Sequence, residues 1–367
     1  MLRDTIWLRE QLRLALAMFP LIAGGCDVID SAQAQPPIHM PSCPSGDFCA
    51  PAKAVRPLAT NKVTKLGCPV ELEEHHDDTN KDGLPTFSTA NLDGEATKQS
   101  RAAHKAKPDD CCYQWMERCP GGRSLLGATS EPIVAATRAG IAWGRDARAC
   151  ELAPALREAL AAGWLADALA EHASIASFAR ATLELLAVGA PPELIAETQR
   201  ASLDEIEHAR AAFALAARYG GRPVEPGALA IAAPRGGGTS RVARDVLVEG
   251  CIGETIAALC VSRAAAACED AELAATLRAI AGDEARHAAL AWKTVAWAVA
   301  AHGGTLVAEL RAVAAEVRVA SLRGELPAAE PLAAALAAHG RLDERARARA
   351  VRDAWREILD PTLARLG

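Results

Sequence analysis

The chain has 367 residues, enough for two or three domains with a sizeable core. Its formal net charge of −6 argues against a nucleic-acid-binding surface, so no nucleic-acid partner is expected. Half of the residues are apolar but only 4% are aromatic, and alanine dominates after about residue 135. This mixture favours closely packed helices over sheets, because alanine has the highest helix propensity whereas strands favour β-branched and aromatic residues.

Residues 1–26 are typical of an export signal. Basic residues precede an apolar run over residues 14–25, which is shorter than the ~20 residues that a membrane-spanning helix needs. The run ends in a segment similar to the lipobox of bacterial lipoproteins, in which Cys26 would be lipidated and become the new N-terminus. Ala23 stands where leucine is preferred, so a plain secretory signal is the alternative. We expect an exported protein of the periplasm or cell envelope, held to a membrane by a lipid anchor on Cys26.

Residues 27–130 carry most of the prolines, polar clusters and cysteines, and they show little helical periodicity. An even number of cysteines in an exported, loop-rich segment is typical of a disulfide framework. The six cysteines are Cys43, Cys49, Cys68, Cys111, Cys112 and Cys119. No spacing among them matches the paired Cys-x-x-Cys of a zinc site, which makes a metal cluster the weaker alternative. We predict a small irregular segment held together by disulfides whose pairing stays open.

The same segment contains one sequence that partly matches a calcium-binding loop. Asp78, Asn80, Asp82 and Gly83 match its opening, but Thr89 stands at the twelfth position, where a bidentate glutamate is required. Asp, Asn and Gly are also ordinary turn residues, so a solvated turn is the preferred interpretation and bound calcium is not expected.

From about residue 152 the sequence predicts long helices separated by glycine and proline. The predicted helices cover 154–188, 192–219, 241–268, 270–302, 305–323 and about 331–359. Short connections make the first two helices, and likewise the third and fourth, antiparallel hairpins. The long loop 222–240 between the hairpins can run the length of a bundle. We therefore predict an all-α fold, with a four-helix bundle over 150–304 and accessory C-terminal helices over 305–367.

The pattern Asp-Glu-x-x-His occurs twice, once in each predicted hairpin. Residues three apart share a helix face, so Glu205 points the same way as His208, and Glu284 the same way as His287. Two such faces turned toward each other supply two carboxylates and two imidazoles, which is half the ligand set of a two-metal site.

Further carboxylate ligands are expected from the first and third helices. Glu171 is the carboxylate of the first helix at the matching height. On the third helix, Glu254 lies about as far from the hairpin turn as Glu284, whereas Glu249 corresponds to Glu171 under the internal repeat. Five residues turn an α-helix by ~500°, so Glu249 and Glu254 should point about 140° apart and are not both expected to be ligands. Height favours Glu254, and Glu249 remains the alternative.

This layout resembles the metal ligands of the ferritin-like di-iron carboxylate proteins, over roughly residues 150–304. The residues that carry the resemblance are Glu171, Glu205, His208, Glu254 or Glu249, Glu284 and His287. It implies two iron ions bridged by carboxylates and reacting with oxygen or peroxide; manganese suits the same ligands. It also implies that Asp204 accepts the spare N–H of His287, and Asp283 that of His208, which fixes each ring.

We therefore expect an exported di-iron protein that uses oxygen or peroxide in an oxidation, with Fe(II), peroxide or an organic molecule as its substrate. No catalytic residue is expected beyond the metal ligands. One alternative is an envelope protein that binds or handles metal without turnover. Another is a structural lipoprotein in which the bundle is a scaffold.

Overall fold

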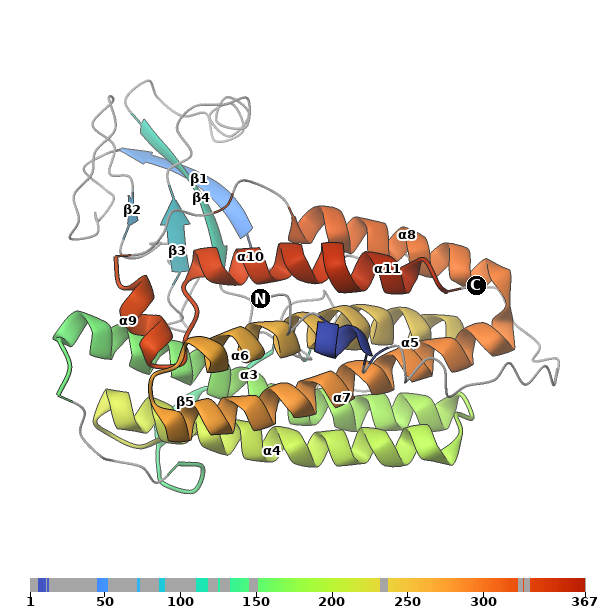
Figure 1. Ribbon diagram of the computed structural model, residues 1–367, viewed down its shortest axis with the longest axis horizontal. Helices are drawn as coiled ribbons and strands as arrows, with labels where there is room; N and C mark the ends of the chain where they lie inside the picture. Colours follow the sequence, from blue (N-terminus) through green and yellow to red (C-terminus); the bar gives the residue numbers. More distant parts are fainter. Residues whose placement is uncertain are drawn as a thin grey trace. The chain divides into compact units, whose positions relative to one another are not determined.

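The computed structural model describes two units of the chain, Met1–Met40 with Pro120–Gly367, and Pro41–Cys119 (Figure 1). Full descriptions, side chains included, cover residues 6–10, 12, 125, 133–144, 151–231, 237–322, 326 and 331–366. Four strands between residues 45 and 117 are described by their backbone alone.

The larger unit is mostly helical, which confirms the predicted dominance of helices. Its described helices are α3 (Pro154–Ala187), α4 (Pro192–Gly220), α5 (Thr239–Asp245), η1 (Val246–Glu254), α6 (Thr255–Ala267), α7 (Ala271–His302), α8 (Gly304–Ser321), α9 (Ala333–Ala338), α10 (Glu344–Ala354), η2 (Trp355–Leu359) and α11 (Asp360–Leu363). The segments η1 and η2 are π-helical, so their backbone hydrogen bonds join residues five apart. The third predicted helix is thus three consecutive segments with a π-helical centre.

The ends of the long helices follow from local chemistry. Pro154 and Pro192 are the first residues of α3 and α4, where the missing N–H has no intrahelical partner to lose. Gly221 ends α4 with a φ of 71°, a left-handed conformation that glycine adopts without steric cost. Asp270 caps α7, since its carboxylate accepts two backbone N–H groups of the first turn. Sequence signals therefore locate the helix ends closely.

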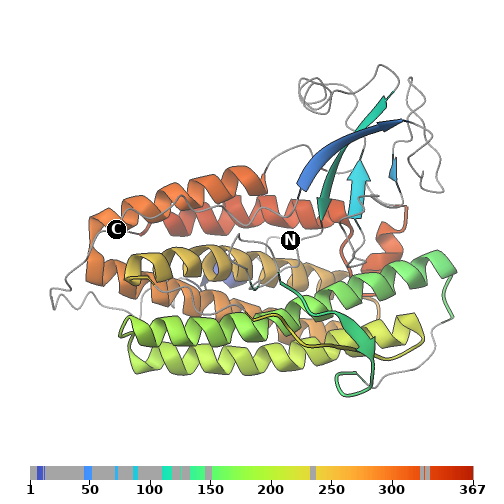
Figure 2. The ribbon, with the colours of Figure 1, turned by 180° about the vertical axis from the view of Figure 1, so that it is seen from behind.

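Two helix hairpins pack against each other in this unit. Helices α3 and α4 run side by side, as both views show (Figure 1, Figure 2), and η1 and α6 lie against α7. Contacts between α4 and α7 join the two hairpins. In the sequence that connects the hairpins, strand β6 (Val224–Pro226) pairs antiparallel with β5 (Thr137–Ala139), which precedes α3. None of the helices in the described part of the chain has the length and hydropathy needed to cross a membrane.

The core of the helical unit forms two large apolar clusters among the described residues. One surrounds Phe213 and Tyr219 and joins α3, α4, α6 and the start of α7. The other surrounds Trp292 and Trp355 and joins α5, η1, α7 and α8 with η2 and α11. All four aromatic side chains are fully buried. The C-terminal helices therefore share a core with α7.

Helical residues near the N-terminus also belong to this second cluster. Leu8 and Leu12 are each only 1% exposed, whereas Ile6 and Trp7 of the same segment are 50% and 41% exposed. The predicted signal 1–26 thus contains two leucines, ahead of its apolar run, that pack in the core of this unit. Cys26, the predicted lipidation site, lies outside the described residues.

The unit Pro41–Cys119 contains an antiparallel sheet in the strand order β1-β4-β3-β2. Its strands are β1 (Ser45–Pro51), β2 (Glu71–Leu72), β3 (Thr86–Thr89) and β4 (Asp110–Glu117). The prediction of an irregular segment was wrong for these strands. The partners β1 and β4 are far apart in sequence, so no local pattern predicts their pairing.

The backbone register of the sheet places Cys49 opposite Cys112, and Ala50 opposite Cys111. The side chains of these three cysteines, and the whole of Cys43, Cys68 and Cys119, lie outside the described part, so the disulfide framework stays a prediction. The residues of the partial calcium motif, Asp78, Asn80 and Asp82, lie outside it as well.

Candidate metal centre

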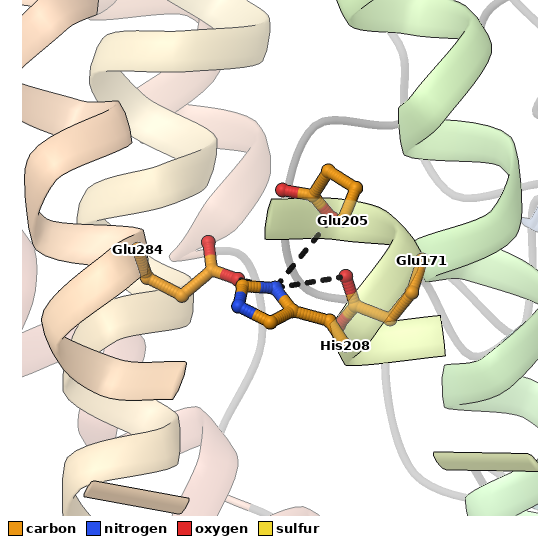
Figure 3. A group of neighbouring side chains, drawn as sticks. All are labelled: Glu171, Glu205, His208 and Glu284. Atoms are coloured by element: carbon orange, nitrogen blue, oxygen red, sulfur yellow. Dashed lines mark ion pairs between the residues drawn. The ribbon is translucent and has the colours of Figure 1, made fainter. Parts of the chain in front are cut away.

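Side chains from both hairpins converge on one cluster in the interior of the helical unit. The cluster consists of Glu171 from α3, Glu205 and His208 from α4, Glu254 from η1, and Glu284 and His287 from α7. Five of these side chains are at most 3% exposed, and only that of Glu171, at 18%, reaches solvent appreciably. Figure 3 shows Glu171, Glu205 and Glu284 gathered around His208. Such burial of carboxylates is costly unless they are paired or bind a cation.

The cluster divides into two overlapping groups, each with four ligand atoms that lie within 4.8 Å of one another. The first group consists of Glu171, Glu205, His208 and Glu284, and the second of Glu205, Glu254, Glu284 and His287. Glu205 and Glu284 belong to both groups. Each group therefore offers the number and type of atoms that could hold a metal ion.

The histidines turn one nitrogen toward the carboxylates. His208 Nδ1 lies 3.3 Å from Glu284 Oε1 and 3.7 Å from Glu205 Oε2. His287 Nδ1 lies 3.1 Å from Glu205 Oε1 and 3.9 Å from Glu284 Oε2. Each histidine thus faces the glutamate of its own helix and that of the opposite hairpin, which gives the cluster an internal pseudo-twofold arrangement.

The other ring nitrogen of each histidine is held by an aspartate on the opposite hairpin. His208 Nε2 lies 3.1 Å from Asp283 Oδ2, and His287 Nε2 lies 3.2 Å from Asp204 Oδ2. A carboxylate only accepts, so each ring donates from Nε2, and the neutral ring presents Nδ1 as an acceptor to the cluster. These are the two hydrogen bonds that the family resemblance implies.

Arg286 joins these two aspartates and was not singled out from the sequence. Its guanidinium forms an ion pair with Asp283, and Nη2 lies 3.6 Å from Asp204 Oδ2. The arginine therefore lies between the outer partners of both histidines. The available signal in the sequence was its position inside the second Asp-Glu-x-x-His motif, next to a predicted ligand, where the first copy has Glu207.

The surroundings shift the pKa of several cluster residues. Burial alone would lower the pKa of His287, but the contacts with Asp204 and Glu205 outweigh it and raise this pKa to about 9. Burial and the neighbouring carboxylates of Glu205 and Glu284 raise the pKa of Glu171 well above its usual value. Burial would also raise the pKa of Glu205, but its contacts with His208 and His287 lower it below the ordinary range. The charge of each of these residues thus depends on the charges of its neighbours in the cluster.

The donor set fits a metal ion. Glu205 Oε2, His208 Nδ1, Glu284 Oε2 and His287 Nδ1 are buried and have no hydrogen-bond partner among the described residues. Buried polar atoms are almost always satisfied, and a cation at each group would satisfy these. Carboxylate oxygens with two imidazoles suit iron or manganese, and zinc also binds such ligands.

The structure separates the two glutamates that the sequence left as alternatives. Glu254 lies in the cluster, whereas Glu249 is buried outside it, with its oxygens 2.9 Å and 3.1 Å from Arg180 Nη2. The expected angle of about 140° between them assumes an α-helix, whereas η1 is a π-helix. In the π-helix η1, backbone hydrogen bonds join residues five apart, so each residue turns the helix by less than in an α-helix.

Comparison of the chain with protein-family models, curated proteins and solved structures finds no match. What the cluster can do chemically therefore follows from its own geometry.

Removing the aspartate partners should weaken metal binding. We expect Asp283→Ala to lower the metal affinity of the group that contains His208, and Asp204→Ala that of the group that contains His287. Each affinity should fall by about 10- to 100-fold, because each ring loses its orienting acceptor. Calorimetric titration of the full chain with Mn(II) measures both affinities. Glu207→Ala is the control, because Glu207 lies on α4 but is exposed and pairs only with Arg210 among the contacts described. Affinities equal to that control would contradict the prediction.

Proposed function

We propose that the two hairpins form a ferritin-like four-helix bundle with a dinuclear metal site, and that the protein is a di-iron oxidoreductase driven by oxygen or peroxide. The observation that carries the proposal is the sharing of Glu205 and Glu284 by two overlapping groups of ligand atoms. Two carboxylates common to two adjacent positions are the arrangement that two bridged metal ions require.

Each metal position is completed by one further carboxylate and one histidine. Glu171 and His208 would complete the first position, and Glu254 and His287 the second, with Glu205 and Glu284 between them. When bound, a pair of iron ions supplies the redox chemistry that activates oxygen or peroxide.

The residues of the chain orient the ligands and exclude water. Asp204 and Asp283 fix the two imidazole rings. Phe178, which is 1% exposed, packs edge-on against His287 with ring centroids 5.1 Å apart and shields it from solvent. Glu171 has the most exposed side chain of the cluster, so a small oxidant or Fe(II) would enter beside it.

Export is a separate part of the proposal and is supported by the sequence of residues 1–26. We propose a lipid anchor on Cys26 that holds the protein to a membrane of the cell envelope. The intact mass of protein isolated from the envelope tests this, because cleavage before Cys26 plus lipid gives a characteristic value. A chain that keeps Leu8 and Leu12 would contradict it.

A second candidate function is metal binding without turnover. The burial of the cluster favours it, since five of the six side chains are at most 3% exposed and a closed site restricts access of larger substrates. In that case the protein would bind or handle iron in the envelope, or keep the metal as a structural element.

Metal content and oxygen uptake together test the two candidates. The full chain is loaded with Fe(II) without oxygen, its metal is quantified by mass spectrometry, and oxygen consumption is then followed after mixing with aerated buffer. We expect two iron ions per chain, one for each group, and rapid oxygen consumption above that of free Fe(II). Two bound ions without oxygen consumption would favour the second candidate. A chain that retains no iron would contradict both.

A further inference from the structure

A buried ion pair connects α3 to η1 beside the metal cluster without belonging to it. The side chains of Arg180 and Glu249 are 5% and 4% exposed, and both carboxylate oxygens face the same guanidinium nitrogen. Ser177 Oγ donates to Glu249 Oε2 at 3.4 Å as a third contact. Removing two charges from water costs several kcal/mol per ion, so buried pairs of this kind often add no stability over apolar residues.

The pair is attached to the same π-helix that carries a cluster ligand. Glu249 lies within η1 and Glu254 is its last residue, so the two are joined by one π-helical repeat. In an α-helix the same two residues would point about 140° apart. The π register therefore sets the direction of Glu254, which lies in the cluster, relative to Glu249, which faces Arg180.

A π-helix is uncommon, because its hydrogen-bond register competes with that of the ordinary α-helix. If η1 returned to the α register, one residue would be displaced and Glu254 would rotate by about 100°. That rotation would take its carboxylate away from Glu205, Glu284 and His287. The position of Glu254 thus depends on whatever holds the register of η1.

We propose that Arg180 is a positioning residue: by holding Glu249 it fixes the π register of η1 and so presents Glu254 to the second metal position. This inference rests on the proposed two-metal site. It also makes the two positions unequal, because the first group contains no residue of η1 whereas the second contains Glu254. Loss of the ion pair should therefore weaken the binding of one metal ion and leave the binding of the other unchanged.

The test is a stepwise titration with Co(II), whose absorption reports each ion as it binds, on the full chain and its variants. Replacing both partners, Arg180→Leu with Glu249→Leu, avoids leaving one charge buried alone and should keep the thermal unfolding temperature near that of the wild type. We expect one Co(II) ion to bind with unchanged affinity and the other at least about 10-fold more weakly. Hydrogen exchange of backbone amides in 246–254 should become faster.

A matched control is the ion pair between Lys293 of α7 and Glu197 of α4, with Nζ 2.9 Å from the carboxylate. It joins two helices that carry ligands but touches no residue of η1 among the contacts described. Replacing both of its partners by leucine should leave both Co(II) steps unchanged. A second variant, Glu249→Gln, keeps the size of the side chain and removes its charge, and it serves if the double leucine variant fails to fold. It should weaken the binding of the same single Co(II) ion.

The outcomes separate this inference from the proposed function. Two unchanged Co(II) steps in a folded Arg180→Leu, Glu249→Leu chain, or in Glu249→Gln, would overturn the role of Arg180 and leave the two-metal site standing. Equal weakening of both steps would also overturn it, because a general loosening of the bundle predicts that result. Failure of the wild-type chain to bind Co(II) would overturn the two-metal site itself.

Discussion

Replacing Glu205 and Glu284 together by alanine should reduce the bound metal from two ions per chain to none. Both carboxylates belong to both groups of ligand atoms, so their loss leaves each position with one carboxylate and one histidine. Glu171→Ala and Glu254→Ala should each affect mainly one ion, because each residue belongs to a single group. Metal analysis of chains loaded with Fe(II) and then freed of unbound metal measures the difference.

The control for the double variant is Glu207→Ala with Glu272→Ala. It removes the same charge from the same two helices, α4 and α7, at exposed positions. Circular dichroism should show that all variants keep their helices. Full metal content in the Glu205, Glu284 double variant would contradict the assignment of these residues as shared ligands, and full loss of metal in the control would show that the effect is not specific.

Removing the metal with a chelator should lower the thermal unfolding temperature without unfolding the chain at room temperature. The apolar clusters around Phe213 and around Trp292 and Trp355 supply the core independently of the metal cluster. Binding to the folded state alone stabilises it by about 2.7 kcal/mol per site when free metal is 100 times the Kd. For two sites this corresponds to a shift of roughly 10 to 20 °C in a domain of this size.

Thermal denaturation followed by circular dichroism, with and without chelator, measures this shift. The Glu205→Ala, Glu284→Ala variant should unfold at one temperature under both conditions, because it has no metal to lose. Unfolding of the wild type by chelator at 25 °C would contradict the prediction and make the metal a requirement for folding, as in small zinc domains.

The residues that sequence reasoning missed are two arginines, of which Arg180 is buried and Arg286 is exposed. Arg180 and Arg286 each hold a carboxylate next to the cluster, and Arg286 also approaches a second one. Arginine is common on exposed helix faces, so neither position signals its role by residue type alone. Asp283 lies three residues from Arg286 on α7, whereas Glu249 and Asp204 lie on other helices and are brought to their arginines only by packing.

The sequence by itself determined the helices and the candidate ligands. Glycine, proline and capping residues act within a few positions along the chain, so the ends of α3, α4 and α7 could be predicted closely. The repeated Asp-Glu-x-x-His motif depends only on helix periodicity, which places Glu205 with His208 and Glu284 with His287 on one face each. Hairpin connections too short to allow another pairing then indicated which helices pack together.

The sequence favoured Glu254 by its height and left Glu249 as the alternative, and tertiary structure decided which of them joins the cluster. The choice of Glu254 over Glu249 depends on the π register of η1, and no local sequence signal specifies that register. The same is true of the sheet formed by β1 to β4 and of the burial of Leu8 and Leu12. Each of these features arises from contacts between residues far apart in sequence, whose free energy no short window of the chain contains.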